Sequence, residues 1–516
     1  MSFPWLTVIG AIPLAGSIVL TGLPSVRTKL AKQVALGITL VTLALTIAMA
    51  VQFAPKGDRF QFTEQVSWIP SFGVHYALGV DGIALVLLLM TVVLWPVVVL
   101  ASWHECESTK FSAKTYLALM VSMETLLIGV FVSTDLFLFY ALFEAMLVPM
   151  YFIIGSHGTP RSSYASMKFL LYSLFSGLLM LAAVIALYAV GPGGKDAFLY
   201  SNLQHLDLPV NDARWLFLGF FFAFAVKAPL WPFHTWLPDA AAESPVGGTV
   251  LLVGVLDKVG TFGFLRYCLG IFPGASHWFT PVVLVLAVIA VLYGALQAIG
   301  QKDLLRLIAY VSVSHFGLIT VGVFAFTSQG QSGATLYMVN HAFSTGALLL
   351  VIGFMIHRRR SRGINDFGGM QKVAPILAGT FLVACLSGLS LPGLNTFVSE
   401  FLVLVGTFTR YKVAAGFATL GIILACVYML LMYQRTMTGP VAPHVEGAKD
   451  LSLREKWVIA PMIAVIVFLG FYPQPILDVI NPAVSATLQH TGNSDPPPVV
   501  PSADNSILTN IAGGSS

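Results

Sequence analysis

Six ionisable residues lie inside long apolar stretches of the sequence, where such side chains are rare. They are Glu144, Lys227, Lys258, His315, His341 and Glu400. A charged side chain at the centre of a lipid bilayer costs roughly 2.5–3.5 kcal/mol on insertion scales. Because six such groups without partners or use would carry a large penalty, we expect them to face the protein interior, interact with one another and contact water.

The chemistry of these side chains fits proton transfer. Carboxylates and imidazoles exchange protons readily, and burial allows a lysine to lose its proton. We expect Glu144 and Lys227 to form a switchable ion pair. The second lysine and the two histidines would relay the proton laterally, and Glu400 would pass it out or onward, because neighbouring charges couple such groups.

Structural explanations of the same residues remain open. Glu144 and Lys227 can be a structural buried ion pair, and the two histidines can be hydrogen-bonded core residues. Ser312 and Ser314 are then the natural partners of His315. Four further ionisable residues are weaker candidates for the pathway: Glu124, His234, Asp239 and Glu243. The last three either line a water-filled entry or lie in a solvated loop, and Asp135 is expected as a helix N-cap.

The composition indicates that lipid is the main solvent of this chain. Of 516 residues, 57% are hydrophobic and only 10% charged, whereas a soluble domain averages about 25% charged residues. The net charge of +4 does not indicate nucleic-acid binding, because the basic residues sit in short loops between apolar runs. The four cysteines are far apart, and no metal-binding or nucleotide-binding signature is visible.

The apolar stretches predict an all-α polytopic membrane protein of about fourteen helices. A bilayer needs about 20 apolar residues per helix, and these stretches are too long for barrel strands. The predicted spans are residues 3–21, 30–54, 78–102, 114–133, 135–155, 164–190, 213–237, 244–272, 279–300, 304–326, 333–356, 373–409, 414–434 and 456–480.

The distribution of positive charge predicts the orientation. Most of the 27 Lys and Arg residues fall in one alternate set of loops, which the positive-inside rule places in the cytoplasm. Arg266 is assigned to a loop of the opposite set. An even number of spans then puts both termini on the outer, periplasmic side of a bacterial inner membrane.

Two of the predicted spans are interrupted at mid-length. The seventh contains Lys-Ala-Pro-Leu-Trp-Pro (227–232), and the twelfth contains Leu-Pro-Gly (391–393). They occupy corresponding positions in two five-helix units, spans 4–8 and 9–13, and an odd repeat length inverts the second unit. Paired broken helices in inverted repeats indicate a transport site, although proline can also merely kink a membrane helix.

These features divide the chain into five parts. They are an N-terminal three-helix segment (1–113), a first repeat (114–272), a second, inverted repeat (273–438), a C-terminal helix (439–484) and a tail (485–516). The tail is rich in Pro, Ser, Asn and Gly, a composition typical of disorder.

Five stretches resemble the antiporter-like subunits of respiratory complex I, and the likeness covers nearly the whole chain. They are Phe-Glu-Ala-Met-Leu-Val-Pro (143–149), Lys-Ala-Pro-Leu-Trp-Pro-Phe-His-Thr-Trp-Leu-Pro-Asp-Ala (227–240), Lys-Asp-Leu-Leu-Arg-Leu-Ile-Ala-Tyr-Val-Ser-Val-Ser-His (302–315), Asn-His-Ala-Phe (340–343) and Leu-Pro-Gly-Leu-Asn-Thr-Phe-Val-Ser-Glu-Phe (391–401). The resemblance implies fourteen helices, two inverted repeats and proton translocation driven by quinone reduction elsewhere in the complex. It implies that Glu144 and Lys227 form the input pair, and that the other four residues form the central axis and the output.

Within that family, the acid at position 400 resembles the M-type branch rather than its L-type and N-type relatives. Those relatives are then the expected neighbours in the membrane arm. The resemblance implies no cofactor in this chain, with NADH, FMN, iron–sulfur clusters and quinone in partner subunits. Related chains leave two alternatives open: a subunit of a multisubunit cation/proton antiporter, and a membrane subunit of an energy-converting hydrogenase. A mere structural anchor is disfavoured by the buried ionisable groups.

Three positions depart from the family pattern. Ala241 stands where a histidine is frequent, so proton entry would use Glu243, His234 or water instead. Asp257 precedes Lys258 where an apolar residue is usual. Adjacent helical residues do not share a face, so we expect no direct pair, although the carboxylate charge would bias Lys258 toward protonation. Ser399 replaces a common glycine beside Glu400.

Overall fold

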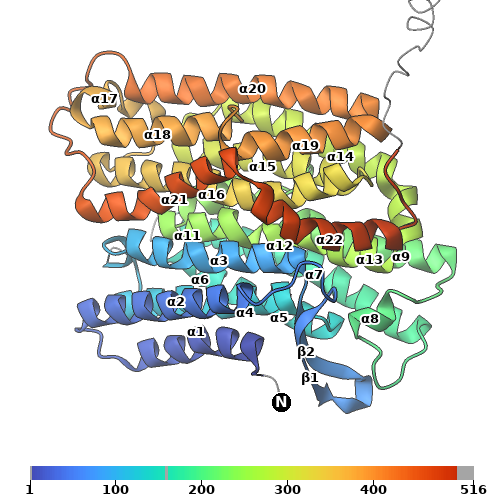
Figure 1. Cartoon of the computed structure of the whole chain (residues 1–516). Helices are drawn as coiled ribbons and strands as arrows, with labels where there is room; N and C mark the ends of the chain where they lie inside the picture. The colour runs from blue at the N-terminus through green and yellow to red at the C-terminus, as the bar shows by residue number, and fades with distance from the viewer. Residues whose placement is uncertain (1–2, 108, 157–160, 497–516) are drawn as a thin grey trace, which may run out of the picture.

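The computed structural model describes residues 3–107, 109–156 and 161–496. Most of this chain is helical, and the long helices lie side by side with roughly parallel axes (Figure 1). The connecting loops therefore gather at the two ends of the bundle, as expected for helices that cross a bilayer.

The N-terminal part contains four long helices and a small hairpin. Its elements are α1 (Trp5–Gly22), α2 (Thr28–Ala50), β1 (Gln61–Ile69), η1 (Pro70–Phe72), β2 (Val74–Val80), α3 (Gly82–Ala101), η2 (Glu105–Glu107) and α4 (Ala113–Val132).

The next part carries the first interrupted span and a helix with two π-helical segments, η3 and η4. Its elements are α5 (Leu136–Ala145), α6 (Leu147–Gly155), α7 (Ser162–Val190), α8 (Tyr200–Leu203), α9 (Val210–Lys227), α10 (Trp236–Glu243), α11 (Val246–Leu251), η3 (Leu252–Leu256), α12 (Lys258–Gly263), η4 (Phe264–Cys268) and α13 (Leu269–Ile271).

The C-terminal half carries the second interrupted span. Its elements are α14 (Pro273–Ile299), α15 (Leu304–Val323), α16 (Ser328–Arg359), η5 (Ile364–Asp366), α17 (Met370–Val373), α18 (Pro375–Gly388), α19 (Asn395–Arg410), α20 (Lys412–Met437), α21 (Leu453–Phe471) and α22 (Gln474–His490).

Helices occupy all fourteen predicted stretches, but not all of them are long single helices. Within the described residues, 11 helices are long and apolar enough to cross a membrane, or 12 if α21 and α22, which bend by 70°, form one span. Both predicted interruptions are present, because α9 ends at Lys227 and α18 ends at Gly388. The count of fourteen spans, the inverted repeats and the division into five parts stay predictions.

The helices at the centre of the bundle are those that carry the two histidines and Lys258. The segment from α11 to α13 is entirely buried, and α15 and α16 are nearly so, whereas only 39% of the apolar stretch of α7 and 33% of that of α20 are buried. The exposed faces of α7 and α20 carry residues such as Phe175 and Ile423, which suit contact with lipid. The central helices are thus shielded by the others.

The hairpin of β1 and β2 was not predicted. The two strands pair antiparallel, and their turn requires Gly73, which has a φ of +69°. A Cβ on Gly73 would also lie 2.2 Å from the carbonyl oxygen of Gly194, so only glycine fits this close approach. The apolar strand β2 runs directly into α3, and the sequence therefore merged Leu78–Val80 with the third span.

Two further assignments were wrong. Arg266 lies inside the buried segment η4 rather than in a loop, and its Nη2 is 2.8 Å from Oδ1 of Asp81. Burial of this arginine is possible because the carboxylate of Asp81 neutralises it. At the other end of the chain, α22 continues to His490, so residues 485–490 of the expected tail are helical. Residues 497–516 lie outside the described part of the chain.

Candidate functional site

Lys258 and His341 are in direct contact at the centre of the bundle. Nζ of Lys258 lies 2.8 Å from Nδ1 of His341, and it donates a second hydrogen bond to the carbonyl oxygen of Val253 at 2.6 Å. Both residues are fully buried. The predicted neighbourhood of this lysine and this histidine is therefore present, across the boundary between α12 and α16.

The second histidine extends this contact along α15. The ring centroids of His315 and His341 are 5.3 Å apart, and neither ring nitrogen of His315 has a hydrogen-bond partner among the described residues. Ser312 and Ser314 donate instead to backbone carbonyl oxygens. The structural explanation of His315 as a histidine satisfied by these serines is therefore wrong.

A tyrosine joins the histidines to Glu400. The ring of Tyr337 lies 5.6 Å from that of His315, and its hydroxyl donates a hydrogen bond to Oε1 of Glu400. Tyr337 is not among the residues predicted from the sequence. The spacing could have indicated this residue, because Tyr337 precedes His341 by four residues and thus shares one face of α16 with it.

Glu400 is buried in α19, shortly after the second interruption. Its neighbour Ser399, one of the departures from the family pattern, donates to the carbonyl oxygen of Thr396 and accepts a hydrogen bond from Nδ2 of Asn340 at 3.1 Å. The same amide donates to the carbonyl oxygen of Asn395 at 2.7 Å. These bonds fix α19 against α16 and thereby position Glu400.

Glu144 and Lys227 are close but do not form the expected ion pair in the described part of the chain. Lys227 Nζ lies 3.5 Å from the hydroxyl oxygen of Ser173. It also sits 5.3 Å and 5.2 Å from the ring centroids of Phe143 and Phe169. These aromatic faces and the hydroxyl stabilise the ammonium away from the carboxylate.

The carboxylate of Glu144 rests against α7 at Gly177. A Cβ at Gly177 would lie 1.6 Å from Oε1 of Glu144, so the absence of a side chain makes room for the carboxylate. Ser173 and Gly177 are four residues apart, and α7 therefore presents one face to both Lys227 and Glu144. Glu144 is only partly buried within this chain, unlike the other five predicted residues.

The weaker candidates divide into two groups. Glu124 is fully buried in α4, and neither of its oxygens has a hydrogen-bond partner among the residues that the structure describes. His234 is also buried, with its ring 5.1 Å from that of Tyr293. Among the described residues, neither Glu124 nor His234 forms a hydrogen bond or an ion pair with the buried groups that run from Lys258 to Glu400.

Asp239 and Glu243 are held in ion pairs at one end of the bundle. Asp239 binds Nζ of Lys168 at 2.7 Å and Nη2 of Arg306 at 2.9 Å, and Glu243 lies 3.4 Å from Nη2 of Arg362. The interpretation of this region as a solvated loop is wrong, because Glu243 is buried and α10 is tied to α7 and α15.

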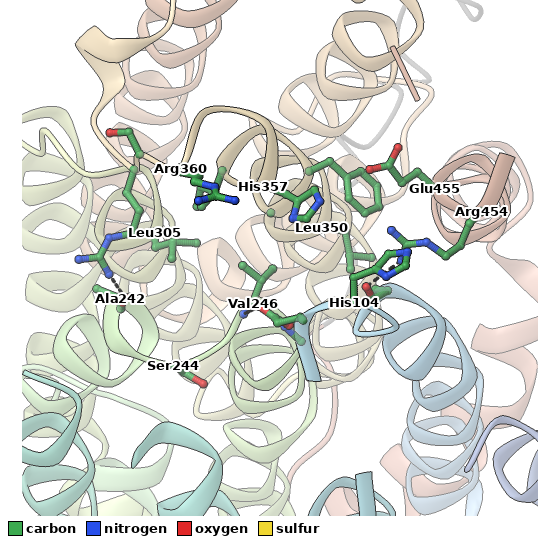
Figure 2. A pocket seen from close by; sticks show the side chains of 18 residues that line it. His104, Ala242, Ser244, Val246, Leu305, Leu350, His357, Arg360, Arg454 and Glu455 are labelled. Atoms are coloured by element: carbon green, nitrogen blue, oxygen red, sulfur yellow. Dashed lines mark hydrogen bonds between the residues drawn. The ribbon is translucent and has the colours of Figure 1, made fainter. Parts of the chain in front are cut away.

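A cavity of about 790 Å³ lies beside these ion pairs. Figure 2 shows its lining side chains, which come from the ends of α3, α10 and α16, from η2, and from the starts of α11, α15 and α21 and the loops beside them. Ala242, Ser244, His357, Arg360 and Arg454 are among them. The cavity is large enough to hold many water molecules, and Arg362, the ion-pair partner of Glu243, lines it.

The described residues contain no group of three or more His, Cys, Asp or Glu side chains placed to hold a metal ion.

Comparisons with known proteins show the family of this chain. Residues 133–427 match the family model described as "NADH:quinone oxidoreductase/Mrp antiporter, TM", which is more than half of the chain. The chain belongs to the NADH:quinone oxidoreductase/Mrp antiporter family. Residues 30–130 match a second family model, the amino terminus of NADH-ubiquinone oxidoreductase chain 4. The predicted resemblance to antiporter-like subunits of complex I is thereby confirmed.

Similar proteins within this family cover nearly the whole chain. NADH-quinone oxidoreductase subunit M of Mycobacterium tuberculosis is 50% identical, over 96% of both chains. Subunit M of Rhodobacter capsulatus is 39% identical, over 94% of this chain and 96% of that protein. A chain of respiratory complex I from Thermus thermophilus superimposes with a TM-score of 0.86 at 30% identity, over 95% of this chain and all of that chain. The Mrp complex from Dietzia sp. shares the fold, with a TM-score of 0.85 at 22% identity.

Proposed function

We propose that this chain is a proton-translocating membrane-arm subunit of an NADH:quinone oxidoreductase. The observation that carries the proposal is the buried series of titratable groups from Lys258 through the two histidines and Tyr337 to Glu400. Identity of 50% to a subunit M along 96% of the chain supports this complex over the antiporter and hydrogenase alternatives.

The contacts suggest how a proton moves through this series. The ammonium of Lys258 donates toward Nδ1 of His341 at 2.8 Å, so the transfer needs only a short hop along an existing hydrogen bond. At the far end, the Tyr337 hydroxyl donates to Glu400. The steps from His341 to His315 and from His315 to Tyr337 are longer than a hydrogen bond, and water or a ring rotation is needed there.

Glu144 and Lys227 supply the switch of this mechanism. In the arrangement seen here the ammonium points to Ser173 and two aromatic rings, which corresponds to an open pair. When the pair closes, the carboxylate stabilises the charged ammonium; when it opens, the lysine gives up its proton more readily. Alternation between the two states moves charge toward or away from the centre of the bundle.

A neighbouring membrane subunit would cover Glu144. A partly exposed carboxylate in an apolar helix is costly against lipid, whereas a protein neighbour can shield or pair it. The L-type and N-type subunits of the membrane arm are the proposed neighbours. The energy then comes from NADH oxidation, with FMN and iron–sulfur clusters, and from quinone reduction in partner subunits.

The proposed location is the bacterial inner membrane, with both termini on the periplasmic side. The charged end of the bundle, which holds the cavity of Figure 2 and the ion pairs of Asp239 and Glu243, would then face the cytoplasm. A cavity of about 790 Å³ next to α10 would admit protons from that side.

Purification through an affinity tag on this chain tests the proposal. The expected result is a complex that contains flavin, oxidises NADH with quinone as acceptor and acidifies one side of a liposome. A tagged complex that lacks flavin and exchanges sodium for protons would assign the chain to an antiporter instead. Hydrogen evolution without NADH oxidation would assign it to a hydrogenase.

A further inference from the structure

Asp257 is a fully buried carboxylate to which the proposed pathway assigns no role. Neither of its oxygens has a hydrogen-bond partner among the described residues. Two other buried acids are satisfied: Asp135 accepts hydrogen bonds from the backbone N–H groups of Phe137 and Leu138, and Asp81 pairs with Arg266. A buried carboxylate without such partners is expensive, which suggests a use beyond stability.

The helix directs Asp257 toward the end of α9. Asp257 and Gly260 are three residues apart and so lie on one helical face. A Cβ on Gly260 would be 2.5 Å from the backbone nitrogen of Ala228 and 2.6 Å from the carbonyl oxygen of Phe224. This face therefore packs on the last turn of α9, which ends at Lys227.

Lys258 points elsewhere because it is one residue further along. One residue turns an α-helix by about 100°, since there are 3.6 residues per turn. The Lys258 side chain accordingly reaches His341 on α16. Asp257 is thus directed toward the end of α9, where Lys227 lies, and its neighbour Lys258 is directed toward His341.

The charge of Asp257 acts on both lysines. Its carboxylate interacts electrostatically with Lys227 and with Lys258. Neither ammonium forms an ion pair with it within the described chain, so the carboxylate is not locked to one partner. A group shared by two sites in this way is placed to accept a proton from one and deliver it to the other.

We infer that Asp257 carries protons between Lys227 and Lys258, an inference that rests on the proposed function. In the first step an N–H bond of the Lys227 ammonium breaks and an O–H bond forms on the Asp257 carboxylate, leaving both groups neutral. In the second step that O–H bond breaks and an N–H bond forms on the neutral amine of Lys258. The carboxylate and an ammonium are restored, and no electrons are transferred.

Substitution of Asp257 in the intact complex tests this inference. Asp257→Asn keeps the shape but cannot bind the proton, Asp257→Leu removes all polarity, and Asp257→Glu keeps the titratable group. We expect the Asn and Leu variants to lower NADH-driven proton translocation by about tenfold or more, as for loss of a proton-transfer group. The Glu variant should retain most of the proton translocation, because it keeps a titratable group. A purely structural role of the carboxylate does not predict this difference between the Glu and Asn variants.

Failure of the inference about Asp257 can be distinguished from failure of the proposed function. Wild-type proton translocation in an assembled Asn or Leu variant overturns the role of Asp257, even if the other variant does not assemble. Equal losses in the Asn and Glu variants also overturn it, because they indicate a steric effect. Glu144→Gln is measured in parallel: if it too translocates protons normally, the proposed function itself fails.

Discussion

The ammonium of Lys258 lies 2.8 Å from Nδ1 of His341, although 83 residues separate them in sequence. This contact joins the first residue of α12 to the long helix α16. His341 also faces His315, so Lys258 of the first predicted repeat is connected to two histidines of the second. The contact is the point at which the first predicted repeat meets the second.

Replacing His341 with alanine should break this connection. Lys258 would keep only the carbonyl oxygen of Val253 as a hydrogen-bond partner, and the proton of Lys258 would lose its acceptor. We expect coupled turnover to fall by about 10²-fold, the usual effect of removing an acid–base group. NADH oxidation and proton uptake in liposomes measure this loss. His205→Ala, at an exposed position, is the control, and equal rates in the two variants would refute the assignment.

Tyr337→Phe should impair the output side without disturbing assembly. The change removes the hydroxyl that donates to Glu400 and leaves the ring in place. A hydrogen bond to a charged group contributes about 1.5–3 kcal/mol, so Glu400 should hold its charged form less well. Proton translocation per NADH should decrease while the complex stays intact on native gels. An unaltered ratio would show that Tyr337 is a packing residue only.

Gly177→Ala should mimic a mutation of Glu144. The new methyl group would lie 1.6 Å from Oε1 of Glu144, and the carboxylate must move away from α7. We expect a marked loss of proton translocation, although alanine favours helices over glycine by about 1 kcal/mol. Gly416→Ala in α20, where nothing lies within 4 Å of the added atom, is the matched control. The prediction fails if both alanine variants behave alike.

Asp81→Ala should reduce stability rather than alter proton chemistry. Asp81 caps α3 through the backbone N–H of Ala84 and pairs with the buried Arg266. Removing one partner of a buried ion pair costs about 3–5 kcal/mol, because the other charge stays uncompensated. The thermal transition of the purified complex should shift down, or assembly should fail. Asp207→Ala, at an exposed position before α9, should leave the transition unchanged.

The sequence predicted individual elements better than their contacts. Asp135 caps α5 as expected, because capping depends on residues next to it in sequence. Both interruptions follow from local proline and glycine. By contrast, Tyr337 was overlooked because an aromatic residue in an apolar helix resembles core packing until its hydroxyl partner, Glu400, is known.

The same limit explains the other errors. Arg266 was assigned to a loop, and only Asp81, far away in sequence, makes its burial acceptable. The open arrangement of the switchable Glu144–Lys227 pair also depends on distant residues, because Ser173 and two aromatic rings compete for the ammonium. Such competition between partners from different helices cannot be derived from the order of residues alone.

Proton translocation by the complex that carries Glu144→Gln tests the central claim most directly. The glutamine keeps the shape of the side chain next to Gly177 and removes its charge, so the complex should assemble and still contain flavin. In liposomes, the ratio of protons translocated to NADH oxidised is the quantity to measure. The proposed switch predicts that translocation is abolished in this variant. A wild-type ratio at a wild-type rate would contradict the account.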